Sequence, residues 1–202
     1  MELNIKAALR TKIDSITPIS DDEFDQSFRL FNRTQIKKGA YFVEAGKVCN
    51  QIGFIGKGIL RTFVTKENGQ EATTCFCSEN QFTTSFRSLI TQAPSQFTIQ
   101  SIEESELLTL EYSHLQFLYK NTKSWSTIGR ILAEREYLNM QSHALALNQE
   151  TAKDKYLRLL KEQPLVAQRA PVQQIASYLG VTRETLSRIR NQVASDFVTF
   201  VK

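Results

Sequence analysis

The feature that most constrains this chain is a run near its C-terminus in which a glycine separates two short helical patterns. Pro171 opens the first pattern, Gly180 ends it, and Thr182 stands where it can cap the second. The apolar positions of the two patterns are Ile175, Ala176 and Leu179, followed by Leu186, Ile189 and Val193. Small Ala176 lets the two helices approach closely, and Gly180 permits the positive φ of a tight turn. The spacing therefore predicts a helix-turn-helix.

The outward side of the second helix carries polar and charged side chains. The N-terminal end of such a helix enters the major groove of DNA, where an arginine can bond guanine O6 and N7 and a glutamate can accept from cytosine N4. The expected base-reading residues are Arg183, Glu184, Ser187 and Arg188. The expected phosphate contacts, assisted by the positive helix ends, are Thr182, Thr185 and Gln173. The alternative is a solvated surface on which Arg183, Glu184 and Arg188 pair with one another.

Charge is unevenly distributed along the 202 residues. Residues 1–112 hold 12 Lys and Arg against 14 Asp and Glu, residues 113–147 hold 4 against 2, and residues 148–202 hold 9 against 5. The positive excess lies at the end that carries the predicted helix-turn-helix, which suits phosphate contact. No stretch approaches the roughly 20 apolar residues of a membrane span, and the N-terminus lacks the apolar centre of a secretory signal. We expect a cytoplasmic protein with no membrane partner.

The part of the chain from Arg33 to about Leu110 is rich in strand-forming residues. Short β-branched and aromatic runs alternate with turn residues about every ten positions, which is typical of an antiparallel sandwich or barrel. Residues 59–65 and 71–77 flank a loop that contains Asn68-Gly69, a step favoured in hairpins, and they predict a β-hairpin. The β-rich part follows a helical pattern formed by Ile5, Leu9 and Ile13.

A long helix from Ser124 to about Leu147 is predicted to connect the β-rich part to the C-terminal helices. Its apolar side chains form a heptad-like stripe whose members are Ile128, Ile131, Leu132, Leu138 and Leu145. Such a stripe either packs into the core of its own chain or joins two copies as a dimer seam. The predicted domains are therefore a β-rich domain at 1–112, a helical connector at 113–147 and a DNA-binding domain at 148–202.

The sequence resembles the Crp/Fnr superfamily, the bacterial regulators related to the cyclic-AMP receptor protein. The run from Arg183 to Arg188 matches the family's recognition-helix pattern R-E-T-V-G-R, departing at Leu186 and Ser187. The resemblance implies an α+β fold with an N-terminal cyclic-nucleotide-binding-like jelly roll, a long dimerisation helix and a C-terminal winged helix-turn-helix. It also implies a homodimer on double-stranded DNA with a palindromic operator whose half-sites lie roughly 34 Å apart, and RNA polymerase as a further candidate partner.

The resemblance does not extend to the residues that hold a cyclic nucleotide. Family members that bind one carry a Gly-Glu pair for the ribose and an Arg-Ser pair for the phosphate, whereas Thr84-Ser85 and Ser95-Gln96 stand at those places here. A phosphate would lose its bidentate arginine partner. The remaining candidates for a ligand pocket are Thr84, Ser85, Arg87, Ser88, Ser95 and Gln96. We expect a small-molecule effector other than a cyclic nucleotide, or none.

Other sensing chemistries lack their residues. An iron–sulfur sensor needs about four cysteine ligands, and the chain has three, Cys49, Cys75 and Cys77. Haem binding would depend on His114 or His143, which we interpret as surface or interface residues. Cys75 and Cys77 lie in a predicted strand and are interpreted as buried, reduced thiols, with thiol oxidation left open. Neither a metal nor a haem or iron–sulfur cofactor is expected.

Enzyme activity is not expected, because the sequence has no catalytic triad, metal cluster, P-loop or Gly-rich dinucleotide motif. The leading hypothesis is a dimeric, sequence-specific transcription regulator. The alternative is a ligand-binding or protein-interaction module of the cyclic-nucleotide-domain type that does not bind DNA specifically. Salt dependence distinguishes the two, since phosphate contacts release counterions.

Overall fold

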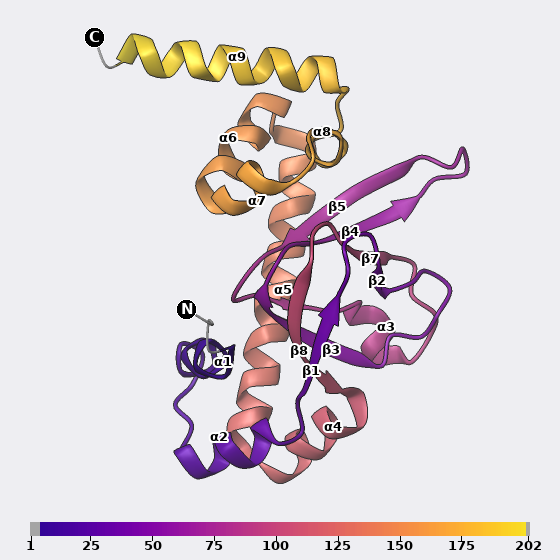
Figure 1. Ribbon diagram of the computed structural model, residues 1–202, viewed down its shortest axis with the longest axis vertical. Coiled ribbons are helices and arrows are strands. Elements are labelled where there is room, and N and C mark those ends of the chain that lie inside the picture. Colours follow the sequence, from indigo (N-terminus) through magenta and orange to yellow (C-terminus); the bar gives the residue numbers. More distant parts are fainter. Residues whose placement is uncertain (1–4, 201–202) are drawn as a thin grey trace.

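The structure is a computed structural model that describes residues 5–200, with the side chains of all but residues 143, 144, 146–148 and 197–200. It consists of a β-domain, a long helix along its side and a helical head, α6 to α9 (Figure 1). The β-domain and the helices before it comprise α1 (Ile5–Asp14), α2 (Asp21–Phe28), β1 (Asn32–Ile36), β2 (Tyr41–Val43), β3 (Gln51–Lys57), β4 (Leu60–Thr65), β5 (Glu71–Cys77), β6 (Phe82–Thr83), α3 (Phe86–Thr91), β7 (Thr98–Ser101) and β8 (Ser105–Glu111). The connector and the head comprise α4 (Tyr112–Asn121), α5 (Lys123–Gln149), α6 (Ala152–Glu162), α7 (Pro164–Arg169), α8 (Val172–Leu179) and α9 (Arg183–Phe200).

The β-domain contains two antiparallel four-stranded sheets, with strand orders β1-β8-β3-β6 and β2-β7-β4-β5. Ile55 and Leu107 of the first sheet pack with Leu60 and Ile99 of the second in one buried cluster. A buried cluster to which both sheets contribute is the arrangement of a sandwich core. The predicted antiparallel β-domain is confirmed, and so is its hairpin, because β4 and β5 pair over the expected residues.

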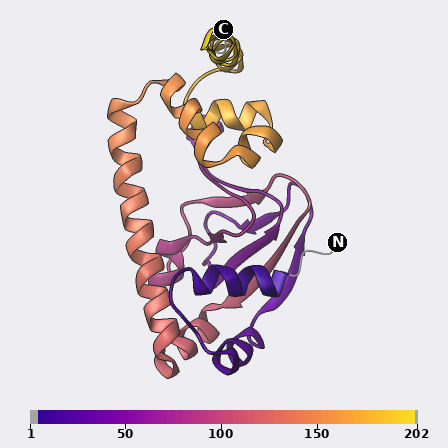
Figure 2. The ribbon, with the colours of Figure 1, turned by 90° about the vertical axis from the view of Figure 1, so that its left-hand side faces the viewer.

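The N-terminal helix and the start of α5 share a second core at one end of the β-domain. Ile5, Leu9 and Ile13 are all buried, as their fourfold spacing predicts, and they belong to one cluster with Trp125 and Ile128 of α5. Helix α5 then runs past the side of the β-domain to the head (Figure 2). The head is therefore carried at the far end of a helix whose first turns are anchored in the core.

The connector and head differ from the sequence-based expectation in three places. The sequence also favours Ser113 as the N-cap of a short helix before the long one, but this helix, α4, begins at Tyr112 and Glu111 occupies its N-cap position. Helix α5 spans Lys123–Gln149, slightly longer than predicted. Within residues 150–200 the structure describes helices and no strand, so the wing implied by the resemblance is not found in this described part of the chain.

Gly58 joins β3 to β4 in a conformation that only glycine tolerates there. Its φ is +105°, and a Cβ at this position would lie 2.8 Å from the Ser105 Cα. Because left-handed strain and a clash with backbone add together, Gly58→Ala should lower the free energy of unfolding by about 2 to 4 kcal/mol. Gly69→Ala is the matched control, since Gly69 has φ +80° but open space around it, and it should cost about 1 kcal/mol. Urea denaturation measures both, and equal losses would contradict the clash.

Candidate nucleic-acid interface

Helices α8 and α9 are joined by the glycine turn that the sequence predicts. Gly180 takes φ +72°, and the Val181 amide closes the turn by donating to the Ala176 carbonyl over 3.0 Å. The Thr185 amide donates to the Thr182 hydroxyl over 3.2 Å, so Thr182 caps α9. The turn and the cap together fix the direction of the first turn of α9.

An apolar cluster holds α8 and α9 against the rest of the head. The head members of this cluster are Tyr156, Leu159, Val166, Ala170, Ile175, Ala176, Leu179, Leu186, Ile189 and Val193. Ile175 and Leu186, one from each helix of the pair, are fully buried. Burial of this stripe turns the opposite side of α9 toward solvent.

The solvent side of α9 carries the predicted base-reading residues. Arg183, Glu184, Ser187 and Arg188 are all exposed. Among the described residues, neither Arg183 nor Arg188 forms an ion pair with a carboxylate. The only side-chain contact of Arg188 that we find there is a hydrogen bond of 3.2 Å to the Thr185 hydroxyl. The two guanidinium groups are thus available to an external acceptor, and the self-paired surface does not form.

Glu184 is held in its charged form at the same helix end. Its own backbone amide and the Thr182 hydroxyl lower the pKa of Glu184, and the charges of Arg183 and Arg188 act in the same direction. At neutral pH the side chain is therefore an acceptor only, which suits a donor such as the cytosine amino group.

The predicted phosphate contacts lie at the N-terminal ends of the two helices. Gln173 is exposed in the first turn of α8, Thr182 is exposed before α9, and Thr185 is half-buried in the first turn of α9. The hydroxyls of Thr182 and Thr185 hydrogen-bond over 3.2 Å. Helix N-termini favour anions because their first amides are unpaired. Figures 1 and 2 show α9 at the end of the molecule farthest from α4, with its outer side open.

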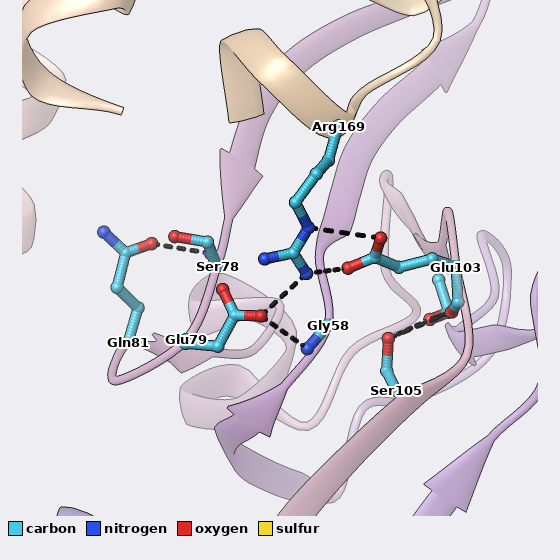
Figure 3. A network of polar contacts seen from close by, with 8 residues as sticks. Gly58, Ser78, Glu79, Gln81, Glu103, Ser105 and Arg169 are labelled. Atoms are coloured by element: carbon cyan, nitrogen blue, oxygen red, sulfur yellow. Dashed lines mark hydrogen bonds and ion pairs between the residues drawn. The ribbon is translucent and has the colours of Figure 1, made fainter. Parts of the chain in front are cut away.

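An arginine at the end of α7 attaches the head to the β-domain (Figure 3). Arg169 Nη2 lies 2.7 Å from Glu79 Oε1 and also pairs with Glu103. The Gly58 amide donates to the same Glu79 oxygen over 2.9 Å. Burial would raise the pKa of Glu79, but Arg169 and the Gly58 amide outweigh it and lower the pKa. Hydrogen bonds to Glu103 and Glu79 raise the pKa of Arg169, so Arg169 and Glu79 are both ionised at neutral pH.

The open edge of β5 is covered by α8. Strand β5 is the last strand of its sheet and would otherwise present unpaired backbone groups. The Thr73 amide donates to the Ser177 hydroxyl over 3.0 Å, and that hydroxyl donates to the Glu71 carbonyl over 2.9 Å. The rings of Phe76 and Tyr178 meet edge to face, with centroids 5.6 Å apart. Sequence reasoning missed both attachments, because each joins residues about 70 to 105 positions apart with no local pattern.

The predicted ligand pocket is filled by its own hydrogen bonds. Ser85, Ser88 and Ser95 are at most 6% exposed. The Ser95 hydroxyl donates to the Ser85 hydroxyl over 2.8 Å, and the Cys49 amide donates to the Ser88 hydroxyl over 2.9 Å. Thr84 belongs to the same region, where its hydroxyl donates to the Gln51 carbonyl over 3.0 Å.

The two remaining pocket candidates lie at the surface and bind each other. Arg87 Nη1 donates to Gln96 Oε1 over 2.9 Å. A surface hollow of about 200 Å³ is lined by residues 41–44 and 47–51, none of which belongs to the six candidates. The structure therefore brings the six residues together around α3, but each of them already has a hydrogen-bond partner within the protein.

The predicted dimer stripe of α5 divides into two halves. Ile128 is 1% exposed and lies in the core of its own chain, while Ile131 and Leu132 are half-buried. Ile128 is therefore not a seam residue, because the N-terminal helices already cover it. The second half of the stripe is open, with Leu138 57% and Leu145 56% exposed.

The cysteines and histidines depart from the expectation at one point. Cys49 is buried, but Cys75 is exposed and Cys77 half-buried, so the expectation of buried thiols is wrong for this pair. His114 is half-buried and its Nδ1 has no partner, while the side chain of His143 lies outside the described residues.

Two kinds of feature are not found in the described part of the chain. No group of three or more His, Cys, Asp or Glu side chains could hold a metal ion there. No helix described there is long and apolar enough to cross a membrane.

Comparison with known proteins bears on the fold. Residues 33–122 match the family model of the cyclic nucleotide-binding domain. The chain is similar to the solved structure of FixK2 from Bradyrhizobium japonicum, with 16% identity, 82% of this chain and 85% of that chain covered, and a TM-score of 0.72. It is also similar to the Thermus thermophilus catabolite activator protein, with 21% identity, 93% and 88% covered, and a TM-score of 0.56. The fold is Crp/Fnr-like.

A third solved structure is also similar to this chain. The c-di-GMP responsive global regulator CLP of Xanthomonas campestris is 16% identical, with 88% of this chain and 93% of that chain covered and a TM-score of 0.66. No match is found by sequence among curated proteins. The likeness covers both the β-domain and the head, so the Crp/Fnr-like arrangement applies to most of the chain.

The Arg169 network predicts a pH-dependent attachment of the head. Because the pKa of Glu79 is lower in the folded than in the unfolded chain, its contribution to stability is present above about pH 4.5 and is lost as pH falls through the lowered pKa. Arg169→Gln should therefore lower the free energy of unfolding by about 1 kcal/mol at pH 7 and by clearly less at about pH 3.

Arg130→Gln is the matched control, because the Arg130–Glu134 pair is more than half exposed. It should change stability by less than about 0.5 kcal/mol at either pH. Urea denaturation at the two pH values measures both variants. A loss in Arg169→Gln that does not depend on pH would contradict the role of Glu79.

Proposed function

We propose that this chain is a sequence-specific DNA-binding transcription regulator of the Crp/Fnr type that acts as a homodimer. The observation that carries the proposal is the first two turns of α9, where Arg183 and Arg188, which have no carboxylate partner among the described residues, lie on a capped helix at the open end of the molecule. In this proposal α8 and α9 form a helix-turn-helix, and α9 lies in the major groove. The descriptions of its structural neighbours as a catabolite activator protein and a global regulator support a regulatory role.

Each exposed side chain of α9 has a defined task in the proposed complex. Arg183 and Arg188 donate to guanine O6 and N7, and Glu184, held ionised, accepts from a cytosine amino group. Ser187 lies between them and reads the same groove. Thr182, Thr185 and Gln173 bond to phosphates at the two helix N-termini, which sets the register of α9 on the duplex.

The homodimer follows from the open half of the α5 stripe. Leu138 and Leu145 are seven residues apart, one heptad, and both are more than half exposed. Two copies of α5 packed along this half would bury these residues and place two heads on one side of the dimer. Such a dimer would read a palindrome whose half-sites are centred about 10 base pairs apart.

The effector of the proposed regulator is not a cyclic nucleotide. A cyclic phosphate would have to displace the hydrogen bonds of Ser85, Ser88 and Ser95 and would gain no buried arginine in return. Arg87 is already engaged with Gln96. Regulation therefore requires a signal that changes the attachment of the head to β5, since an effector acts by binding one arrangement more tightly than another.

The base-reading assignment predicts a loss of sequence preference. Selection from a random duplex pool identifies an operator for the wild-type protein. Arg183→Ala and Arg188→Ala should each weaken binding to that operator by about 1 to 3 kcal/mol and leave binding to unrelated duplex nearly unchanged. Gel-shift titration against both duplexes measures the difference.

Arg29→Ala is the control for this experiment. Arg29 is equally exposed but stands at the end of α2, far from α9 (Figure 1). Its loss should leave the preference for the operator intact. A wild-type protein that selects no sequence and binds DNA without salt dependence would instead support the alternative, a ligand-binding or protein-interaction module.

The dimer assignment predicts an effect of Leu138 on assembly. Leu138→Gln should convert the dimer to a monomer at micromolar concentration without loss of fold, because the side chain contributes to a seam and not to the core of its own chain. Met140→Gln is the matched control: Met140 is 65% exposed but lies about 200° around the helix from Leu138. Sedimentation velocity distinguishes the variants. A wild-type monomer, or dimers in both variants, would refute the seam.

A further inference from the structure

Cys75 and Cys77 stand two residues apart on β5, and their sulfur atoms are 3.9 Å apart. Alternate side chains of a strand point to the same face, so the two thiols share one face and Phe76 points to the other. Cys75 is exposed, Cys77 is half-buried, and both are free. This pair belongs neither to the surface of α9 nor to the six residues around α3.

The two thiols differ in their readiness to ionise. The hydrogen bond between the two sulfurs raises the pKa of Cys75 and lowers the pKa of Cys77, and the Thr83 hydroxyl lowers the pKa of Cys77 further. Glu136 of α5 disfavours negative charge on both sulfurs. Cys77 is therefore the sulfur that ionises more readily, and Cys75 is placed to attack its oxidised product as the resolving thiol.

The residues around Cys75 and Cys77 do not favour a closed metal site. Zinc and iron–sulfur centres take about four protein ligands. Among the described residues no third His, Cys, Asp or Glu joins the two thiols in a metal-binding group. Two adjacent thiols can instead be joined in a disulfide when an oxidant removes two electrons and two protons from them.

We propose that Cys75 and Cys77 are a modification site for hydroperoxides, at which oxidation joins them in a reversible disulfide and loosens the head from β5. The Cys77 thiolate attacks the O–O bond and keeps one oxygen as a sulfenic acid, while the other oxygen takes a proton and leaves as an alcohol or water. The Cys75 sulfur then attacks the sulfenic sulfur and expels water. Two thiols and one hydroperoxide thus give one disulfide, one water and one alcohol or second water.

Closing the disulfide must distort the strand between the two cysteines. Side chains at alternate positions of an extended strand leave it in parallel, so their Cβ atoms, like their Cα atoms, are about 6.6 Å apart, beyond the roughly 3.5 to 4.5 Å found in disulfides. Bringing the sulfurs from 3.9 Å to about 2.05 Å therefore requires the backbone at Phe76 to bend. The pairing with β4 shifts register just before Cys75, so this stretch of β5 is already irregular. A distorted disulfide is also more easily reduced, which makes the change reversible.

The bend in the strand falls at Phe76, which also contacts the head. Phe76 packs edge to face on Tyr178 of α8 and lies in the cluster shared by the β-domain and the head. The Thr73 amide, two residues before Cys75, donates to Ser177 of the same helix. Bending β5 at Phe76 acts on both contacts at once. The thiol chemistry on one face of the strand is thus coupled to the docking of α8.

The first test follows the thiols. Reduced protein with a chelator is treated with cumene hydroperoxide, denatured, alkylated and weighed as the intact chain. We expect the wild type to lose two of its three alkylatable thiols and to regain them with a dithiol reductant. Cys49→Ala should still form the disulfide, whereas Cys75→Ser should stop at a sulfenic acid on Cys77 that dimedone traps. Three alkylatable thiols in treated wild type, or a disulfide between two chains, would overturn the proposal.

The second test follows the head without DNA, so its result does not depend on the proposed function. Hydrogen exchange of the Thr73 amide should become at least about fivefold faster after oxidation, because typical coupling free energies between two sites correspond to a factor of about five or more. The Cys75→Ser/Cys77→Ser variant, treated identically, should show no change. Exchange in the oxidised wild type that equals the reduced rate would refute the coupling even where the disulfide forms.

Discussion

The contact between α8 and the open edge of β5 is the interaction on which the rest of the arrangement depends. A sheet edge must be covered, and here the cover is the helix that precedes the DNA-reading helix of the proposal. Because Gly180 and Thr182 fix the angle between α8 and α9, the attachment of α8 also sets where α9 points. Arg169 secures the same head from the side of α7 through two glutamates of the β-domain. The contacts between the head and the β-domain therefore determine the orientation of α9.

The hydrogen bonds of the interior around α3 support the proposal that no cyclic nucleotide is bound there. At the positions where the family resemblance implies a Gly-Glu and an Arg-Ser pair, this chain carries Thr84-Ser85 and Ser95-Gln96. The Ser95 hydroxyl donates to the Ser85 hydroxyl, and Ser88 accepts from the Cys49 amide. Buried polar groups that are fully paired stabilise the fold, whereas a pocket prepared for an anion would leave donors without partners. The interior of the β-domain is thus closed, and the thiol pair of β5, of which Cys75 is exposed, lies on the strand that contacts the head.

Local spacing predicted the parts of the fold that local forces determine. The fourfold repeat of Ile5, Leu9 and Ile13 gave a buried helix, and the apolar positions on either side of Gly180 gave α8 and α9. The hairpin of β4 and β5 followed from its turn and alternation. In each case the periodicity of one element was enough to assign the buried face.

Features that join distant segments could not be read in the same way. Nothing near Arg169 in sequence indicates Glu79 or Glu103, and nothing near Cys75 indicates that β5 is an edge strand or that the Cys75 side chain is exposed. Ile128 fits a dimer stripe by its spacing, but its position under α1 places it in the core. The resemblance implied a wing, but residues 150–200, as far as they are described, form helices and no strand.

The most direct measurement of the central claim is a cycle that combines a protein change with a change in one base. The selected operator is prepared with guanine or with 7-deazaguanine, which lacks N7, at each conserved guanine, and its affinity is measured for wild type and for Arg183→Ala. If Arg183 contacts a guanine, replacing that guanine with 7-deazaguanine should weaken binding of the wild type by about 1 to 3 kcal/mol. The same replacement should leave binding of Arg183→Ala almost unchanged. Additive losses at every guanine, or none, would contradict base reading by α9.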